Sequence, residues 1–257
     1  MDPLTRRLLS RPRSEPLVLM YHGIADAGEQ VSRWRVSRQA FAEQIRLLRD
    51  SGHYTLRLSE LERPPAPGGV CITFDDGYRD TFDAARLLAD LGFSAAWFLV
   101  SDRVGGQADW DEPGQGAALL GLDELRAMAE AGMEFGSHSA THPRLTDLDE
   151  ASLARELERS RRHLGECLDR NVEAIAYPYG RFDDRVVAAA GRAGYRLGFT
   201  TAAGTANAAA DPLRIRRITI EGTDDLGRFA RKIALAGNDG SWRRLLRYAL
   251  QRTGLAS

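Results

Sequence analysis

The chain has 257 residues, of which 43% are hydrophobic, enough to bury one substantial core in a single domain. Its formal net charge is −1, and charges of both signs are interspersed, so no overall field favours binding to nucleic acid. No apolar run approaches the roughly 18 residues of a membrane-spanning helix, and residues 1–16 lack the apolar stretch typical of a secretion signal. We therefore expect a protein of the cytoplasm or of the inner membrane face.

Strand-like and helix-like segments alternate along the chain. Apolar, β-branched runs predict strands at 17–21, 70–74, 94–100, 133–137, 172–177, 197–201 and 215–220. Apolar residues at helical spacing predict helices at 37–51, 84–88, 122–131, 149–168 and 185–193. Gly, Pro and polar residues predict connecting loops at 61–69 and 102–121. The alternation favours a single α/β domain with parallel strands, most simply an incomplete (β/α)7-type barrel.

Two carboxylates, Asp75 and Asp76, directly follow the predicted strand at 70–74, and Gly77 turns the chain after them. Barrel enzymes place their chemistry at the carboxyl ends of such strands. Because neighbouring residues at a strand end point in different directions, one Asp can face a metal ion while the other faces the substrate. An Asp-Asp-Gly sequence alone also fits an ordinary turn or the start of a helix.

Two imidazoles, His138 and His142, follow the predicted strand at 133–137. Their spacing of four would place both on one face of a helical turn, although such pairs also occur on protein surfaces. With one Asp they form a set of one oxygen and two nitrogen ligands, the pattern of a catalytic zinc-type site with open positions. Ser139 stands where the helical zinc motif has its Glu base, so one of the two carboxylates must act as the base.

Over residues 17–220 the chain resembles the polysaccharide deacetylases of carbohydrate esterase family 4, the NodB-homology domain. The resemblance rests on the Asp and His motifs and on a third motif, Tyr177-Pro178-Tyr179-Gly180, which is similar to an aromatic loop that lines the family's groove. It implies one divalent metal ion, zinc in the first place, with cobalt or nickel as alternatives. The residues that it assigns are the catalytic base Asp75, the metal ligands Asp76, His138 and His142, and Tyr179, whose backbone N–H donates to the oxyanion.

The chain departs from the family pattern in two places. The family often has an Arg before the third motif, where this chain has Ile175 and Ala176, and the late motif near residues 213–220 lacks the usual general-acid His. Tyr21-His22-Gly23 is similar to a subgroup of exopolysaccharide and poly-N-acetylglucosamine deacetylases. His22 also ends a predicted strand on the face of the two carboxylates, and a His can donate a proton near neutral pH. We expect His22 to be the acid; the alternative is that it holds the base or a loop in place.

These residues predict a metal-dependent hydrolase that removes acetyl groups from N-acetylated amino sugars, with an acetylated glycan or polysaccharide as its partner. A sugar polymer needs an open groove with aromatic faces. The residues that we expect to line it are Tyr78, Trp110, Tyr177, Pro178 and Tyr179. Trp110 would also fit a loop anchor on the barrel rim. An O-acetyl esterase for xylan-like polymers and a glycan-binding pseudoenzyme of the same fold remain alternatives.

We divide the chain into an N-terminal extension at 1–16, the deacetylase domain at 17–235 and a basic C-terminal helix at 236–257. In that helix, Trp242-Arg243-Arg244-Leu245-Leu246-Arg247-Tyr248 is both basic and amphipathic. Such a helix can lie on an anionic membrane surface as a peripheral contact, or it can pack across the bottom of the barrel.

Overall fold

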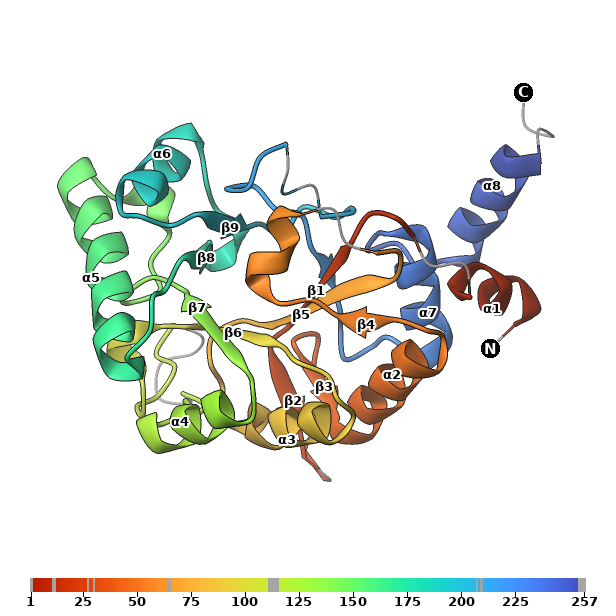
Figure 1. Cartoon of the computed structure of the whole chain (residues 1–257), viewed down its shortest axis with the longest axis horizontal. Coiled ribbons are helices and arrows are strands. Elements are labelled where there is room, and N and C mark those ends of the chain that lie inside the picture. The colour runs from red at the N-terminus through yellow and green to blue at the C-terminus, as the bar shows by residue number, and fades with distance from the viewer. Residues whose placement is uncertain are drawn as a thin grey trace.

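A parallel sheet forms the centre of the protein in the computed structural model (Figure 1). The structure describes residues 2–253 except 11–12, 27, 30, 64–65, 111–115, 207 and 209. Within this part of the chain the strands pair in the order β10-β1-β5-β6-β7-β8-β9, and β4 pairs with β5 beside this row. The strands are β1 (Leu17–Tyr21), β4 (Tyr54–Thr55), β5 (Gly69–Phe74), β6 (Ala96–Leu99), β7 (Glu134–Ser137), β8 (Ala174–Ala176), β9 (Leu197–Phe199) and β10 (Ile218–Thr219).

The sheet curves into an incomplete barrel. All of its strand pairs are parallel, as the alternation of strands and helices predicted. The two ends of the row approach each other through a single bridge between Phe199 of β9 and Ile215, which precedes β10. The predicted α/β fold with an incomplete (β/α)7-type barrel is confirmed.

Helices cover the outside of the sheet (Figure 1). The α-helices are α1 (Pro3–Leu9), α2 (Arg38–Asp50), α3 (Phe82–Asp90), α4 (Leu122–Glu130), α5 (Glu150–Leu168), α6 (Asp184–Arg192), α7 (Leu226–Leu235) and α8 (Trp242–Thr253). Short 3-10 helices are η1 (Leu58–Glu62), η2 (Arg79–Thr81), η3 (Ser101–Arg103), η4 (Leu145–Asp147) and η5 (Pro178–Gly180). Helices α2 and α5 begin where the sequence predicted, because Ser37 and Asp149 cap their first backbone N–H groups.

A separate two-stranded sheet, β2 (Gly23–Ala25) with β3 (Arg35–Ser37), was not predicted. Strands of three residues are too short to show an alternating pattern in the sequence. Asp80 holds this sheet in place, because its carboxylate accepts hydrogen bonds from the backbone N–H of Ile24 at 3.0 Å and from the Arg35 guanidinium at 2.7 Å. The small sheet therefore lies fixed beside the end of β1, next to His22.

The strands of the barrel are buried on both faces, as is usual for a parallel sheet covered by helices. Side chains facing the helices pack with helix residues such as Phe41, Ile45 and Leu153. The barrel interior is filled by alternate strand residues, namely Val18, Cys71, Ala96, Phe98, Ala174, Ala176, Leu197 and Phe199. Because the interior is packed, ligands can enter only at the ends of the barrel.

The terminal helices α1 and α8 lie on the same side of the barrel as α7 (Figure 1). Helix α1 packs against α7, and the Arg13 guanidinium donates to Ala234 O at 3.1 Å. Helix α8 follows α7 and buries Leu245 completely. Residues 1 and 254–257 of the terminal segments, and 111–115 of the predicted loop at 102–121, lie outside the described residues.

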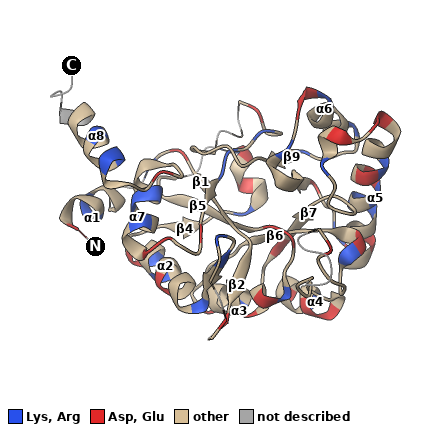
Figure 2. Ribbon diagram, turned by 180° about the vertical axis from the view of Figure 1, so that it is seen from behind, with Lys and Arg blue, Asp and Glu red and all other residues tan. Residues whose placement is uncertain are grey.

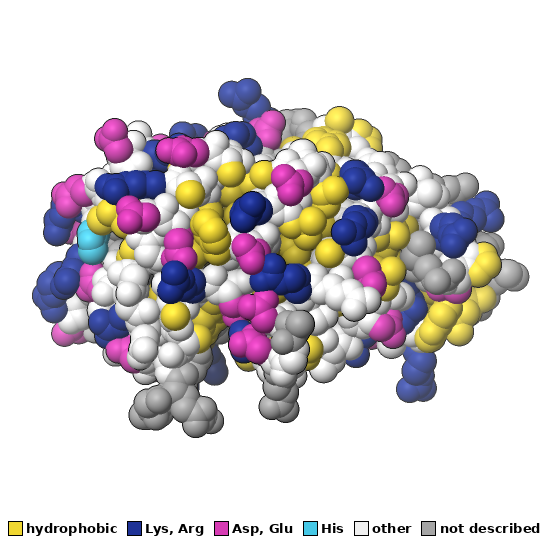
Figure 3. Space-filling view, turned by 90° about the horizontal axis from the view of Figure 1, so that it is seen from below, with side chains coloured by type: hydrophobic (Ala, Val, Ile, Leu, Met, Phe, Trp, Pro, Cys, Tyr) yellow, Lys and Arg dark blue, Asp and Glu magenta, His cyan; other side chains and the backbone are white. Residues whose placement is uncertain are grey.

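Residues of both charges are spread along the ribbon in Figure 2, and Figure 3 shows charged side chains with apolar ones between them on the face seen from below. None of the described helices is long and apolar enough to cross a membrane.

Candidate active site

The turn after β5 sends its two carboxylates in different directions. Asp75 N–H donates to Tyr21 O at 3.0 Å and continues the pairing of β5 with β1, whereas Asp76 has φ 71° and Gly77 has φ 78°. A left-handed backbone is unfavourable for a residue with a Cβ, and it is concentrated at functional sites. The reversal of the chain at Asp76 separates the two carboxylates, as the sequence argument required.

The histidine pair follows β7, but the expected helical turn is wrong. His138 and His142 lie in an irregular loop in which Ser139 has φ 65° and His142 has φ 64°. A helical turn has negative φ throughout, so the spacing of four does not bring the imidazoles together here. The loop instead doubles back on itself, and Ser139 Oγ accepts a hydrogen bond from the backbone N–H of His142 at 3.0 Å.

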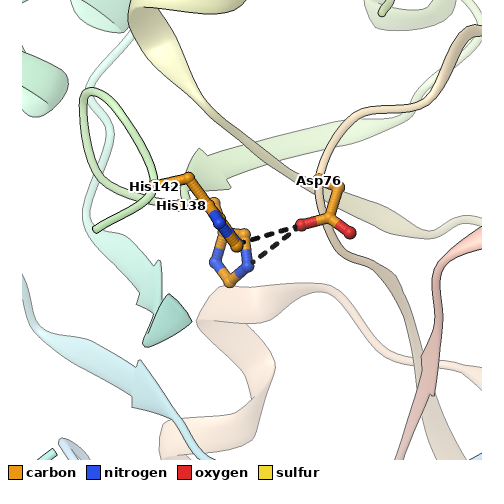
Figure 4. A group of neighbouring side chains, drawn as sticks. All are labelled: Asp76, His138 and His142. Atoms are coloured by element: carbon orange, nitrogen blue, oxygen red, sulfur yellow. Dashed lines mark ion pairs between the residues drawn. The ribbon is translucent and has the colours of Figure 1, made fainter. Parts of the chain in front are cut away.

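The Asp76 carboxylate and the two imidazoles point toward one another (Figure 4). Asp76 Oδ1 lies 3.4 Å from His138 Nε2 and 3.3 Å from His142 Nε2. Their candidate ligand atoms all lie within 4.8 Å of one another, and the three side chains are buried. One carboxylate oxygen and two imidazole nitrogens at this separation suit a divalent ion that keeps open coordination positions.

The protonation states also fit a metal ion. His138 Nδ1 donates to Ala176 O at 2.8 Å, which leaves Nε2, the atom that faces Asp76, as the candidate ligand atom. Burial alone would raise the pKa of Asp76, but hydrogen bonds from the two imidazoles hold it well below its ordinary value. The carboxylate is therefore ionised, the form that binds a cation.

Asp75 has a partner that the sequence did not predict. Arg217, which is 0% exposed, forms a two-pronged ion pair with it, with Nη1 2.6 Å from Oδ1 and Nη2 2.7 Å from Oδ2. Its Nε donates to Thr200 O at 2.9 Å. Burial would raise the pKa of Asp75, but the positive charge of Arg217 holds it below its ordinary value, so this carboxylate is also ionised near neutral pH.

Arg217 lies within the late motif, residues 213–220, which lacks the general-acid His that is usual in the family. The signal available in the sequence was that Arg217 falls on the same strand face as Ile215, whereas Arg216 falls on the opposite face, and an unpaired charge on a buried face would be costly. The alternation of Ile215, Arg217 and Thr219 places Arg217 on the inward face. Such a position requires an anionic partner at the same end of the barrel.

His22 lies on the same barrel face as the two carboxylates, and all three side chains line one cavity. Its ring packs against Trp34 with 4.6 Å between ring centroids, and its Nδ1 is buried without a hydrogen-bond partner among the described residues. Burial lowers the pKa of His22 despite the nearby carboxylates. His22 is therefore neutral near pH 7, and it can donate a proton only after receiving one during turnover.

These groups surround one cavity of about 520 Å³. Its lining includes both carboxylates of the turn, both imidazoles, His22 and four of the five predicted groove residues, namely Tyr78, Trp110, Tyr177 and Tyr179. The expectation for Pro178 is wrong, because it is buried in η5 outside the cavity lining. Trp34, which is 42% exposed, lines the cavity but was missed, because no element was predicted between residues 21 and 37.

The two tyrosines of the third motif differ in their surroundings. Tyr177 is 0% exposed and its hydroxyl donates to Leu213 O at 2.9 Å, so it serves as a fixed part of the wall. Tyr179 is 48% exposed, has φ 57°, and its ring lies 4.6 Å from that of His142. Tyr179 is thus the aromatic side chain of this motif that a ligand can reach.

Comparisons with known proteins match the part of the chain that carries the Asp and His motifs. A family model described as polysaccharide deacetylase matches residues 62–198, just over half of the chain, and this range includes both the Asp and the His motifs. A Bacillus subtilis protein that carries a polysaccharide deacetylase name, YxkH, is 28% identical over 197 residues, covering 74% of this chain and 66% of that protein.

In two further relatives, the match with this chain covers a larger share of the relative's length. A poly-beta-1,6-N-acetyl-D-glucosamine N-deacetylase of Staphylococcus epidermidis is 24% identical over 239 residues, covering 82% of this chain and 81% of the relative. The solved structure of the Streptococcus pyogenes deacetylase PplD in complex with acetate is 28% identical, with a TM-score of 0.71, and the match covers 84% of this chain and 96% of that one.

Proposed function

The chain belongs to the polysaccharide deacetylase family, and we propose that its substrate is a polymer of N-acetylglucosamine. Proteins of this family are metal-dependent hydrolases that remove acetyl groups, which is the activity predicted from the sequence. The observation that carries the proposal is that one cavity is lined by the Asp76, His138 and His142 cluster and by Asp75, whose carboxylate pairs with Arg217 behind it.

Zinc is the ion that we propose for the cluster, with cobalt and nickel as alternatives. Two imidazoles and one carboxylate are the ligand types that catalytic zinc sites use. When bound, the ion would polarise the acetyl carbonyl and lower the pKa of a water molecule. The three side chains of the cluster would hold it at the mouth of the barrel.

Asp75 is the proposed base. It accepts a proton from the attacking water as the water oxygen bonds to the carbonyl carbon of the acetamide. Arg217 holds both oxygens of the carboxylate in place and keeps it ionised, ready to accept that proton. The carbon–nitrogen bond then breaks, a proton is delivered to the departing nitrogen, and acetate and a free amino sugar leave.

Tyr179 and His22 are proposed for the other two requirements of the reaction. The backbone N–H of Tyr179 would donate to the developing oxyanion, which is usually the largest stabilising contribution in acyl transfer. His22 is the remaining imidazole on the cavity wall. It would receive the proton that Asp75 has taken from the water and deliver it to the leaving nitrogen. Trp34 and Tyr179, both exposed at the cavity, offer aromatic faces to the sugar rings.

The proposal is tested by measuring acetate released from β-1,6-linked N-acetylglucosamine oligomers. We expect release by the zinc-loaded protein, loss of release after chelation, and recovery on adding zinc back. Acetylated xylan and β-1,4-linked oligomers serve as comparison substrates. Release from acetylated xylan alone would replace the proposal with an O-acetyl esterase, and release from none of them would contradict it.

We also propose that α8 makes a peripheral contact with an anionic membrane at its cytoplasmic face. Trp242 (48% exposed), Leu246 (55%) and Leu250 (47%) are spaced four apart and thus form one exposed apolar row. Arg243 and Arg247 are also exposed on this helix, whose basic residues are blue in Figure 2. An exposed apolar row beside cations suits anionic lipid headgroups.

The membrane contact is tested by sedimentation with vesicles that contain anionic lipid. Leu246→Ser combined with Leu250→Ser should abolish cosedimentation, because it removes two of the apolar side chains that would enter the headgroup region. Val31→Ser, at an exposed apolar side chain outside α8, serves as the control. Unchanged sedimentation of the α8 double variant would exclude the contact.

A further inference from the structure

The loop between the two metal-binding histidines is not a self-supporting structure. His138 and His142 stand at its ends, and both Ser139 and His142 have left-handed backbones. Such conformations persist in residues with a Cβ only where the surrounding protein imposes them. The bonds that the loop makes to its neighbours therefore decide where the two imidazoles lie.

Glu156 of α5 holds the middle of this loop. Its Oε2 accepts hydrogen bonds from the backbone N–H groups of Ala140 and Thr141, each at 3.0 Å. Its Oε1 accepts from Thr141 Oγ1 at 2.8 Å. Bonds from N–H groups to an ionised carboxylate are stronger than bonds between neutral groups. One side chain thus fixes two consecutive peptide groups between the histidines.

The other backbone N–H groups of the loop find partners on nearby strands or within the loop. His138 donates to Leu99 O at 2.7 Å, Ser139 donates to Ser137 Oγ at 3.1 Å, and His142 donates to Ser139 Oγ at 3.0 Å. Removing the Glu156 side chain would therefore leave the backbone N–H groups of Ala140 and Thr141 without a hydrogen-bond acceptor.

Ser160 extends the support along the same helix. Its Oγ donates to Ser139 O at 3.0 Å and lies 2.7 Å from Ser137 Oγ. Glu156 and Ser160 are four residues apart, so they share one face of α5. This face of α5 therefore bonds to the loop at two places, at Ser139 beside the first histidine and at Ala140 and Thr141 in the middle.

The opposite edge of the loop is bonded to η3. Ser101 N–H donates to Ser139 O at 3.1 Å, and Asp102 N–H donates to Ala140 O at 3.0 Å. Asp102 in turn pairs with Arg159 of α5 at 2.9 Å. Helix α5 thus supports the histidine loop directly and also supports the segment that lies on its other side.

We propose that Glu156 is a positioning residue that sets the geometry of the metal site before the ion binds. The inference rests on the proposed function, since it takes His138 and His142 as metal ligands. Glu156 lies outside the lining of the cavity and touches neither imidazole ring nor substrate space. Its carboxylate acts through the loop backbone, so that the ordering of the two imidazoles is complete in the metal-free protein.

The test compares zinc affinity in the wild type and four variants, measured by competition with a chelating dye and without any glycan. Glu156→Ala should weaken zinc binding by about 10- to 100-fold, the range found when a group that orients a metal ligand is removed. Glu156→Gln should restore most of the affinity. Its amide oxygen can accept both backbone N–H groups, and its amide nitrogen can donate to Thr141 Oγ1.

Two further variants complete the comparison. Glu158→Ala is the matched control, because Glu158 lies on the same helix with its side chain exposed, and it should bind zinc like the wild type. Thr141→Val keeps the shape of the side chain but loses one of the three bonds to Glu156, so it should show a smaller loss in the same direction.

A role in general stability alone would give a different pattern. The thermal midpoint of each metal-free protein is therefore measured beside the zinc affinity. We expect Glu156→Ala to stay folded at the assay temperature while its affinity falls. Wild-type affinity in folded Glu156→Ala would overturn the inference and leave the proposed function intact. If Glu156→Ala does not fold, wild-type affinity in Thr141→Val would overturn it. Absence of zinc binding in the wild type would overturn both.

Discussion

The active-site cavity has two halves that obtain their positive charge from different sources. In the metal half, Asp76 faces two imidazoles, and the proposed ion would supply the positive charge. In the base half, Asp75 already has its cation, because Arg217 is part of the chain and pairs with both carboxylate oxygens. Two neighbouring residues with the same side chain thus have different chemistry because they face different partners. Removal of the ion should disable one half, and mutation of the arginine should disable the other.

The largest effect is expected from removing a ligand in the metal half. Asp76→Ala, His138→Ala and His142→Ala each remove one of three protein ligands, so zinc content and turnover should both collapse. Loss of several kcal/mol of charge stabilisation lowers kcat/KM by about a thousandfold or more. Zinc content is measured by atomic emission beside acetate release, with Asp90→Ala on the exposed end of α3 as control. Full occupancy with normal turnover in one variant would remove that residue from the site.

Asp75→Asn should separate the two halves. Zinc content should stay near that of the wild type, because Asp75 faces Arg217, while kcat falls by about 100- to 10,000-fold, the usual contribution of a general base. The same two measurements apply. Loss of zinc in this variant would show that the roles of the neighbouring carboxylates are reversed.

Arg217→Met should lower the free energy of unfolding and shift the pH dependence of activity. Asp75 has a lowered pKa in the folded protein, so its pairing stabilises the fold above the unfolded-state pKa, and this contribution is lost as pH falls through the folded-state pKa. Without Arg217, the largest charge that opposes the effect of burial is lost and the pKa of Asp75 rises, so activity should fail at a higher pH on the acid side. Leaving Asp75 buried without its partner should cost about 3–5 kcal/mol of unfolding free energy.

Urea unfolding and the pH profile of kcat measure these two effects of Arg217→Met. Arg216→Met is the matched control, because Arg216 is adjacent and exposed. It should leave both quantities unchanged. If kcat of Arg217→Met falls at the same acidic pH as kcat of the wild type, Arg217 does not control the ionisation of Asp75.

The smallest effect is expected at His22, which belongs to neither half. His22→Ala should slow the hydrolysis of amide substrates by about 100-fold, the lower end of the range for acid catalysis. Activated acetate esters should be slowed much less, because their leaving groups need no proton. The measurement is the ratio of kcat values for the two substrates. Equal losses on both would leave His22 as a residue that holds Trp34 or the cavity wall in place.

The sequence predicted the features that depend on local pattern. Apolar strands followed by charged residues located the ends of β5 and β7, and with them the side chains that the structure brings together in the metal cluster. The helical turn at the histidines was wrong because a spacing of four fits both a helix and a loop, and left-handed residues such as Ser139 leave no mark in the sequence. The ion pair of Arg217 could not be seen, because its partner is 142 positions away. Trp34 was missed because β3, which follows it, is too short to show alternation.

The central claim, that an ion in one half and Asp75 in the other act together, is tested most directly by one experiment. Acetate release from N-acetylglucosamine oligomers is followed for the wild type and Asp75→Asn while chelated protein is titrated with zinc. The account predicts that both proteins bind zinc with similar affinity and that release rises with zinc occupancy in the wild type alone. Release from the chelated wild type at the full rate, or from zinc-loaded Asp75→Asn at the wild-type rate, would contradict it.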